Sequence, residues 1–384
     1  MMGIQAMPEF PDNPVLQEDV EELADWAGEQ YGEALSGARI LITGATGLIG
    51  SQVAGTLSAL NRKQGTQLQV LLPVRNAARA AEGRLKGIAG RTETTLWDED
   101  VCAPLSADTV KTAEELRPDY IIHCAAPTRS RDFVARAADT ALAVIDGTRR
   151  MLDLARTCQI RSMIQLSSLE VYGTPRRDAA GSEDVPLLTE VDFGTLDPAK
   201  PRSSYSEGKR MAETLCSAYA AQHQLPVRIL RLTQTFGPGV DYADERAFMA
   251  FARSAMEGQD IVLRTAGRTV RPYLYTADAV RAILTLLMAD GEAFPAGTAA
   301  NAANPKTAVT IVEMAETAAH VIGSSRGHVP AVRIEIPDTA ALAACGFNPE
   351  MQLNLDISRI TALGWMPTRD LAEMFARLAD GVIR

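Results

Sequence analysis

The chain has 384 residues, of which 46% are hydrophobic and 22% charged, proportions typical of a globular protein and unlike a disordered one. Its formal net charge of −10 argues against a nucleic-acid-binding protein. The longest uncharged apolar run, Ala282 to Ala289, is too short to cross a bilayer and no signal peptide is recognisable, so we expect a cytoplasmic protein without a membrane partner.

Negative charge is concentrated at the amino end of the chain. Residues 1–38 hold nine carboxylates and no Lys or Arg, whereas the other 346 residues hold 38 basic against 39 acidic side chains. A charge run of this kind is usually a solvated face, and we interpret it so. Residues 1–12 carry no pattern of regular structure and are predicted to be untethered.

A helix is predicted immediately after this segment. Asn13 and Pro14 supply an N-cap followed by proline at the first helical position, and Gly37 ends the helix. Apolar residues recur at three- and four-residue steps, namely Leu16, Val20, Leu23, Ala27 and Tyr31. Residues 1–37 are therefore treated as an acidic helical extension that packs on the domain behind it.

Short apolar runs then alternate with helical stretches. The predicted strands are Ile40–Thr43, Leu68–Val74, Tyr120–Cys124, Met163–Ser167 and Val227–Leu232, and the predicted helices include Leu48–Leu60, Asp139–Thr157 and Tyr205–Gln222. This alternation predicts an α/β fold: a Rossmann-type doubly wound parallel sheet with a smaller mixed α/β substrate domain. We assign residues 38–237 with 271–302 to the dinucleotide-binding domain, and 238–270 with 303–384 to the substrate domain.

One long irregular stretch, between Gly173 and Ser204, contains four prolines and interrupts the alternation, which is typical of a functional loop. The five cysteines (Cys102, Cys124, Cys158, Cys216 and Cys345) are widely separated and are predicted to be reduced thiols. The four histidines show no metal-ligand spacing, so no metal site is predicted.

A glycine-rich turn follows the first predicted strand and opens the next helix. Gly44 allows a tight turn, Gly47 lets the backbone approach a pyrophosphate, and Gly50 allows close contact between helix and strand. The helix N-terminus then directs free N–H groups at the phosphates. The predicted cofactor-binding residues of this turn are Gly44, Thr46, Gly47, Leu48, Ile49 and Gly50.

The end of the second strand bears on which dinucleotide is bound. A carboxylate there would accept the ribose 2′-hydroxyl of NAD, but the chain reads Leu72-Pro73-Val74-Arg75-Asn76. Arg75 could face the 2′-phosphate of NADP, or it could stack on the adenine of NAD held through other contacts. The two cofactors remain open from the residues alone, with NAD slightly ahead.

Tyr205 and Lys209 lie four residues apart at the start of a helix, hence on one face. A lysine cation about 5 Å away, at an effective dielectric near 20, favours the phenolate by about 3 kcal/mol, or roughly two units of the tyrosine pKa. Tyr205 could then act as a general base for a hydroxyl proton. Ser168, at the end of a predicted strand and therefore in the ligand crevice, could hydrogen-bond the reacting oxygen.

Further motifs accompany this Ser-Tyr-Lys set. In chain order they are Asp100-Val101, His123-Cys124-Ala125-Ala126, Ser167-Ser168-Leu169-Glu170-Val171-Tyr172-Gly173, Arg231-Leu232-Thr233-Gln234-Thr235-Phe236-Gly237-Pro238, Arg271-Pro272-Tyr273-Leu274-Tyr275-Thr276-Ala277-Asp278 and Leu363-Gly364-Trp365-Met366-Pro367. With the glycine turn, they resemble the extended short-chain dehydrogenase/reductases. Within these the chain is most similar to the NAD-dependent epimerase/dehydratase group, which acts on nucleotide-sugars, over roughly residues 38–384.

The resemblance implies roles for individual residues. Asp100 would hold the adenine amino group with Val101 beside it, and Lys209 would also bond the nicotinamide ribose. The remaining implied contacts are Ala125 and Ala126 along the cofactor, and Arg271, assisted by Arg246, on the diphosphate of the nucleotide-sugar substrate. The resemblance also implies a homodimer formed through the helices that begin near Asp139 and Tyr205.

The reaction itself depends on few residues. Related sugar 4,6-dehydratases carry an Asp-Glu pair where this chain has Leu169-Glu170, which disfavours dehydration. The hydroxyl-x-Glu pattern of Ser168 and Glu170 matches the glucuronate decarboxylases of the group. Gln234 replaces the asparagine usual in the family, and the extra methylene would move the amide by about 1.5 Å and change how the substrate is held.

Three reactions remain open, and a 4-epimerase acting on a nucleoside-diphosphate sugar is the first hypothesis. The alternatives are a UDP-glucuronate-type decarboxylase that uses Glu170 and an NADPH-dependent keto-sugar reductase. A catalytically idle nucleotide-binding protein is disfavoured, because Ser168, Tyr205 and Lys209 are all present.

Overall fold

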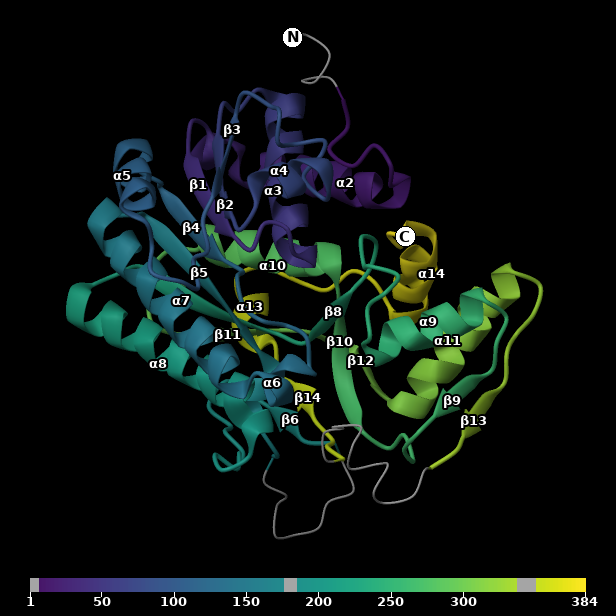
Figure 1. Ribbon diagram of the computed structural model, residues 1–384. Coiled ribbons are helices and arrows are strands. Elements are labelled where there is room, and N and C mark those ends of the chain that lie inside the picture. Colours follow the sequence, from purple (N-terminus) through teal and green to yellow (C-terminus); the bar gives the residue numbers. More distant parts are fainter. Residues whose placement is uncertain (1–6, 176–184, 337–349) are drawn as a thin grey trace.

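Seven parallel strands form the central sheet of the fold (Figure 1). They are β1 (Arg39–Thr43), β2 (Gln69–Val74), β3 (Thr94–Asp98), β4 (Tyr120–His123), β5 (Ser162–Ser168), β7 (Val227–Leu232) and β11 (Ala299–Ala302). Their order is β11-β7-β5-β4-β1-β2-β3, so the winding reverses between β1 and β4 and leaves a crevice at the carboxyl ends of these two strands. The computed structural model describes residues 7–175, 185–336 and 350–384, and it confirms the predicted doubly wound fold.

Five of these strands lie within one residue of the apolar runs that predicted them. The sequence analysis missed β3 and β11. The four residues of β11 read Ala-Ala-Asn-Ala, a composition with low strand propensity, and they form a strand because they pair with β7 and are buried. The edge strand β3 is only half-buried, so its apolar signal is weak.

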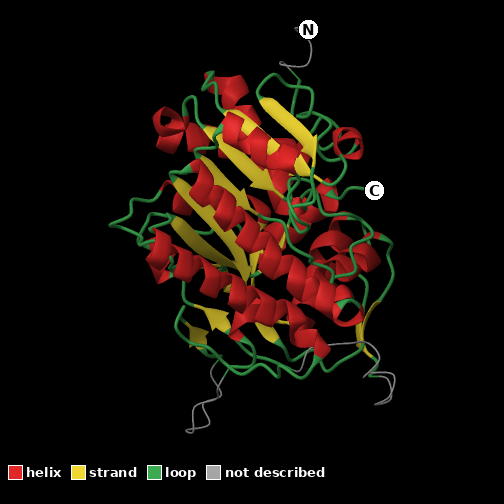
Figure 2. Ribbon diagram, turned by 60° about the vertical axis from the view of Figure 1, so that its left-hand side comes forward, coloured by secondary structure: helices red, strands yellow, loops and turns green. Residues whose placement is uncertain are grey.

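Helices cover both faces of the sheet, and α7 and α8 lie side by side along one of them (Figures 1 and 2). One face carries α3 (Leu48–Gln64) and α10 (Thr276–Met288), and the other carries α5 (Ala107–Leu116), α7 (Ala137–Cys158) and α8 (Ser204–His223). The three helices predicted for this region are thereby confirmed. None of the described helices has the length and apolar character that a membrane span requires.

A smaller mixed part lies beside the main sheet (Figure 1). Its three-stranded sheet contains β8 (Gln234–Phe236), β10 (Val270–Tyr275) and β12 (Asn304–Thr310), with β10 parallel to β8 and antiparallel to β12. Two strand pairs join β9 (Ile261–Leu263) to β13 (Val332–Ile334) and β6 (Leu187–Leu188) to β14 (Asn354–Leu355). The helices are α9 (Ala247–Met256), α11 (Ile311–Ser325), α13 (Ser358–Thr361) and α14 (Leu371–Gly381).

The predicted smaller mixed domain is present, although the exact domain boundaries stay a prediction. Strand β8, which we assigned with residues 38–237 to the dinucleotide-binding domain, pairs with β10 in the smaller sheet. Within the irregular stretch from Gly173 to Ser204, residues 176–184 lie outside the described part, and the rest includes β6 and a 3-10 turn, η2 (Pro201–Ser203). Cys102, Cys124, Cys158 and Cys216 are free thiols, and Cys345 lies outside the described residues.

The predicted amino-terminal helix is present as α2 (Pro14–Leu35). Its N-cap Asn13 accepts a hydrogen bond from the backbone N–H of Leu16 at 3.0 Å, and proline occupies the first helical position. The apolar stripe is buried against α3, α10 and α14. The helix therefore contacts both the cofactor side and the smaller part of the molecule.

The prediction that residues 1–12 are untethered is wrong for residues 8–12. Phe10 is buried against α3, where a Cβ on Gly55 would come within 2.4 Å of the phenyl ring. The carboxylate of Glu9, which has no exposed side-chain surface, pairs with Arg62 at 3.0 Å and with Arg91 at 2.9 Å. A buried carboxylate held by two guanidinium groups fixes this segment to the body of the protein.

The interpretation of the acidic run as a solvated face holds for most of α2, where the exposed carboxylates are Glu18, Glu22, Asp25, Glu29 and Glu33, and it is wrong for the buried Asp19. Exposed carboxylates of this run also make ion pairs with the body of the protein. Glu22 pairs with Arg281 at 2.6 Å and with Arg369 at 3.2 Å. Several other carboxylates of this run make ion pairs with the body, namely Asp12, Glu18, Asp19, Glu21 and Asp25. A run of like charges is therefore neutralised by basic residues far away in the sequence, which a local pattern does not reveal.

Asp19 makes the most buried of these contacts. Its side chain is 1% exposed, and its carboxylate accepts hydrogen bonds from Tyr275 Oη at 2.5 Å and from Arg377 Nη2 at 2.8 Å. Burial is the largest influence and raises the pKa of Asp19 to about 6. The contact joins α2 to the end of β10 and to α14.

We expect the free energy of unfolding to fall as pH rises from about 4 to about 6, by up to about 3 kcal/mol from Asp19 alone. The sign follows because the folded carboxyl binds its proton more tightly than the unfolded one, so the contribution is present at low pH and is lost as pH rises through the folded pKa. Asp19→Asn should lack this component. Urea unfolding of both proteins between pH 4 and 8 measures the difference.

Glu29→Gln is the matched control, because Glu29 lies exposed on the same helix without an ion pair to any described residue. It should keep the slope of the unsubstituted protein. Identical pH slopes for the unsubstituted protein and Asp19→Asn would show that the buried carboxyl does not titrate in this range.

Candidate active site

The glycine turn between β1 and α3 forms one wall of the crevice. Gly44 has φ +66°, and a Cβ on it would lie 2.8 Å from the backbone nitrogen of Ala125. A Cβ on Gly50 would lie 2.4 Å from the carbonyl oxygen of Gly44. Gly47 is the N-cap of α3 and provides no side chain to cap it, so the first N–H groups of this helix are free to bind an anion. The turn fits the pyrophosphate of a dinucleotide.

The other predicted cofactor residues follow the neighbouring strands at the same edge. Arg75 is exposed directly after β2, and Asp100 is exposed after β3, where its carboxylate accepts from the N–H of Cys102 at 3.0 Å. Val101 is buried, and the half-buried Ala125 and Ala126 follow β4. The sheet topology thus brings residues from four separate chain segments to one crevice.

Ser168, Tyr205 and Lys209 meet where α8 crosses the end of β5. The Ser168 side chain lies near the phenol of Tyr205 and lowers its pKa. Lys209 Nζ donates to the carbonyl oxygen of Leu166 at 2.7 Å and lies 5.8 Å from the centroid of the Tyr205 ring. Both α8 side chains are buried, at 8% and 4% exposure, because this face of the helix packs against the sheet.

Burial dominates the ionisation of this pair. It raises the pKa of Tyr205, as does the Glu170 carboxylate, while the Ser168 side chain and the guanidinium groups of Arg202 and Arg246 lower it. Burial also lowers the pKa of Lys209 to about 8. The expectation that lysine by itself makes the phenol acidic is not met in this arrangement, because desolvation outweighs the cationic neighbours.

Several residues beside Tyr205 were not anticipated from the sequence. Phe133, from the short helix α6 (Asp132–Ala135), stacks on the Tyr205 ring with centroids 4.3 Å apart and planes at 4°. The guanidinium of Arg202 lies 5.0 Å from the centroid of Phe133 and pairs with Glu170 at 2.9 Å. Ser206 also donates to this carboxylate, at 3.0 Å. The one feature of the sequence that could have pointed to these residues is that Arg202 stands three residues before Tyr205.

The smaller sheet contributes unpartnered polar groups. Gln234 Oε1, Arg271 Nε and Tyr273 Oη are buried and have no hydrogen-bond partner among the described residues. Gln234 and Tyr273 are register partners on β8 and β10. Buried polar groups without partners are costly, so the donors Arg271 Nε and Tyr273 Oη fit an anionic ligand such as a nucleotide diphosphate, and the acceptor Gln234 Oε1 fits a ligand hydroxyl. Arg246 instead forms a bidentate pair with Asp244, at 2.7 and 3.0 Å.

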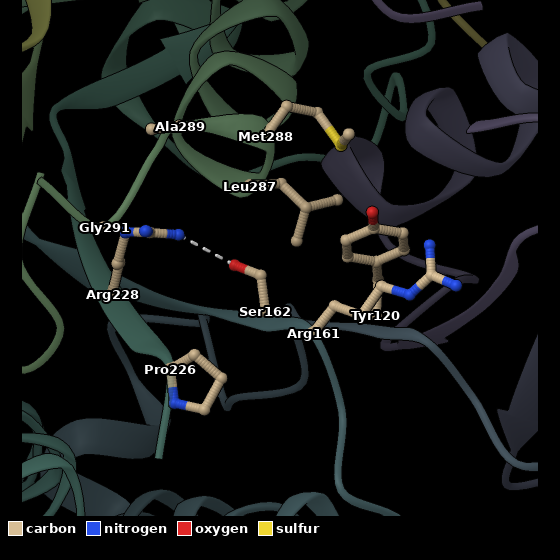
Figure 3. Close-up of a pocket in the computed structure, with 9 residues that line it drawn as sticks. All are labelled: Tyr120, Arg161, Ser162, Pro226, Arg228, Leu287, Met288, Ala289 and Gly291. Atoms are coloured by element: carbon tan, nitrogen blue, oxygen red, sulfur yellow. Dashed lines mark hydrogen bonds between the residues drawn. The ribbon is translucent and has the colours of Figure 1, made fainter. Parts of the chain in front are cut away.

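A hollow of about 280 Å³ lies at the other end of the strands, next to the amino ends of β4, β5 and β7 (Figure 3). Arg228 in its wall donates to Ser162 Oγ at 3.0 Å and to the carbonyl oxygen of Phe294 at 2.8 Å. Ligands of open α/β sheets bind at the carboxyl ends of the strands, so we interpret this hollow as structural. Within the described ranges, no group of three His, Cys, Asp or Glu side chains could hold a metal ion.

The profile of the NAD dependent epimerase/dehydratase family matches residues 40–302 of this chain. UDP-glucuronic acid decarboxylase 6 of Arabidopsis thaliana is 30% identical over 88% of this chain and 87% of the relative. UDP-glucose 4-epimerase of Thermotoga maritima has a TM-score of 0.70 at 19% identity, covering 89% of this chain and 97% of that structure. UDP-glucuronic acid 4-epimerase of Bacillus cereus, solved with NAD, has a TM-score of 0.67 at 21% identity over 89% and 97%.

Gly44→Ala should reduce the affinity for NAD by at least about tenfold, because the new Cβ would lie 2.8 Å from the Ala125 nitrogen and close the turn. Isothermal titration of NAD into the purified protein measures this. Gly65→Ala is the control, since Gly65 has nearly the same φ, +64°, with no atom within 4 Å of the added Cβ. That variant should lose about 1–2 kcal/mol of stability and keep its NAD affinity; equal affinities for both variants would contradict the assignment.

Proposed function

The chain belongs to the NAD dependent epimerase/dehydratase family of nucleotide-sugar-modifying enzymes, and from this premise we propose that it removes the C6 carboxyl group of a nucleotide-linked uronate such as UDP-glucuronate. The observation that carries this proposal is the Arg202–Glu170 pair beside Tyr205. The name of the Arabidopsis relative agrees with it. Decarboxylation therefore moves ahead of the 4-epimerisation that the sequence motifs favoured.

The proposed chemistry begins at the sugar C4 hydroxyl. Bound NAD supplies a reversible hydride acceptor. Tyr205 takes the hydroxyl proton, and Ser168 donates to the same oxygen. A C4 ketone makes the C6 carboxylate a β-keto acid, so the C5–C6 bond breaks, carbon dioxide leaves, and the electron pair moves to the C4 oxygen. Hydroxyl donors at that oxygen stabilise the charge. A proton then adds to C5, and return of the hydride to C4 with the proton held by Tyr205 gives a pentose that has lost carbon dioxide alone.

Arg202 is the residue we assign to the substrate carboxylate. Its guanidinium is half-buried, rests on Phe133, and already pairs with a carboxylate at 2.9 Å, that of Glu170. Exchange of Glu170 for the C6 carboxylate would keep the guanidinium paired and would release Glu170 near C5. The buried donors Arg271 Nε and Tyr273 Oη would hold the nucleotide diphosphate, and Gln234 Oε1 would accept from a hydroxyl of the substrate.

A 4-epimerase remains the second candidate. The observation in its favour is that Ser168, Tyr205 and Lys209 come together where α8 crosses the end of β5. Epimerisation needs no other acid or base. The two reactions give products of different mass and are easily separated.

We also retain the homodimer formed through α7 and α8 as a proposal. Leu142 on α7 and Met211 on α8 are 57% and 46% exposed, and these helices lie side by side on one face of the molecule. Large apolar side chains exposed on adjacent helices favour burial against a second copy.

Incubation of the purified protein and NAD with UDP-glucuronate should give a product lighter by one carbon dioxide, detected by mass spectrometry. A product of unchanged mass with a new stereocentre would identify the epimerase instead.

Tyr205→Phe should lower the rate by at least about a thousandfold while NAD remains bound, because the general base is removed. Full activity in that variant would overturn the assignment of the base.

Arg202→Gln should raise the KM for UDP-glucuronate by at least about tenfold, because the charge-assisted contact to the C6 carboxylate is lost. The affinity for UDP-glucose, which lacks this carboxylate, should change less than about twofold by isothermal titration. Lys200→Gln is the matched control, since it removes an equal charge two residues away at an exposed position. Equal losses for both nucleotide-sugars would show that Arg202 acts on folding or on the shared nucleotide and not on the carboxylate.

A further inference from the structure

Glu213 lies on α8 one turn beyond Lys209 and two turns beyond Tyr205, on the same buried face of the helix. Its side chain is buried, and its carboxylate accepts three hydrogen bonds. The donors are Ser167 Oγ at 2.5 Å, Arg231 Nε at 2.9 Å and Arg231 Nη2 at 2.7 Å. The bidentate arginine gives this buried carboxylate two charge-assisted hydrogen bonds.

The arginine partner is itself held in place. Arg231 Nη1 donates to Tyr172 Oη at 3.0 Å and to the carbonyl oxygen of Glu190 at 2.8 Å. Tyr172 in turn donates to Asn301 Oδ1 at 2.6 Å. The network joins α8 to the ends of β5, β7 and β11, and each of these side chains has its partner. Glu213 therefore has little freedom to move away from Lys209.

Lys209 has few other groups that favour its charge. Its ammonium donates to the carbonyl oxygen of Leu166, and the titratable groups that act on it are Glu213 and Cys216 on α8, Cys124 after β4 and Cys102 after β3. Burial raises the pKa of all three thiols, so they remain neutral at pH 7. His123 beside them is neutral as well, since burial lowers its pKa to about 3. Among these groups, Glu213 is the one carboxylate, and the cation next to it is the Arg231 guanidinium that pairs with it at 2.7 Å.

We propose that Glu213 is a positioning residue that keeps the Lys209 amine protonated beneath Tyr205 and, through Ser167, fixes the strand end that presents Ser168. This inference rests on the proposed roles of Tyr205 and Lys209 and is independent of which nucleotide-sugar is bound. Without a nearby negative charge, an amine at 4% exposure loses its proton at lower pH. A neutral amine would no longer stabilise a phenolate at Tyr205.

The test is a direct titration of Lys209. The chain has six lysines, so protein labelled with carbon-13 at lysine Cε gives six signals, and Lys209→Met identifies the one of interest. In the protein with NAD bound, Glu213→Gln should lower the pH midpoint of that signal by about one unit. Glu213→Asp, which restores the charge, should return the midpoint most of the way.

Ser167→Ala is the control for a purely structural role, because it removes a hydrogen bond to Glu213 without changing any charge. Its Lys209 midpoint should equal that of the unsubstituted protein. If Glu213→Gln does not fold, the double variant Glu213→Gln with Arg231→Met leaves no unpaired ion. It should still lower the Lys209 midpoint, but by less than the single variant, because the cation that opposes the ammonium is lost together with the carboxylate. An unchanged Lys209 midpoint in the folded Gln variant, single or double, overturns the proposal.

A second titration separates this proposal from the proposed function. The ultraviolet difference between the protein and Tyr205→Phe reports the phenolate of Tyr205, and it should move to higher pH in Lys209→Met. If it does not move, Lys209 does not serve Tyr205 and the proposed function fails, even if Glu213 still controls the ionisation of Lys209. If it moves while Glu213→Gln leaves Lys209 unchanged, only the role of Glu213 is wrong.

Discussion

The contact on which the site depends is the burial of one face of α8 against the ends of β5 and β7. This face presents Tyr205, Lys209 and Glu213 at successive turns, and each is tied to the sheet. Lys209 binds the carbonyl oxygen of Leu166, and Glu213 binds Ser167 and Arg231. The position of Tyr205 over Ser168 is therefore set by the helix–sheet packing and not by the flexible reach of a side chain.

Burial has opposite effects on the two titratable groups of the reacting pair. It raises the pKa of Tyr205 and lowers that of Lys209 to about 8. Burial therefore favours the neutral phenol and the neutral amine. The surrounding charges then decide the balance. Arg202 and Arg246 favour the phenolate, and Glu213 favours the ammonium. A pair so arranged responds strongly to any further cation brought next to the phenol.

The sequence allowed the main sheet, the glycine turn and the Ser168, Tyr205 and Lys209 set to be predicted, because each is encoded locally by apolar runs or fixed spacing. Phe133 could not be predicted, since α6 is four residues long and is held beside Tyr205 by tertiary contacts, among them the hydrogen bond from Ser204 Oγ to the Phe133 carbonyl oxygen at 2.9 Å. Arg202 lies in an irregular stretch with no periodicity to interpret. The ion pairs of the acidic run were missed because their basic partners lie 38 to 359 residues away in the sequence.

The amino-terminal segment contacts both structures that line the candidate site, namely the glycine turn before α3 and the strand pair β8–β10. It packs on α3, whose N-terminus forms the phosphate-binding turn, and through Asp19 it holds Tyr275 at the end of β10, the strand that carries Arg271. Tyr275 also packs on the turn after β8, where a Cβ on Gly237 would come within 2.8 Å of its ring. One helix thus restrains both the cofactor turn and the two strands proposed to hold the substrate diphosphate. The helix α2 contacts both the glycine turn and the β8–β10 pair through buried groups. Movement of one relative to the other would therefore require breaking an ion pair or exposing the apolar stripe of α2, and both are costly.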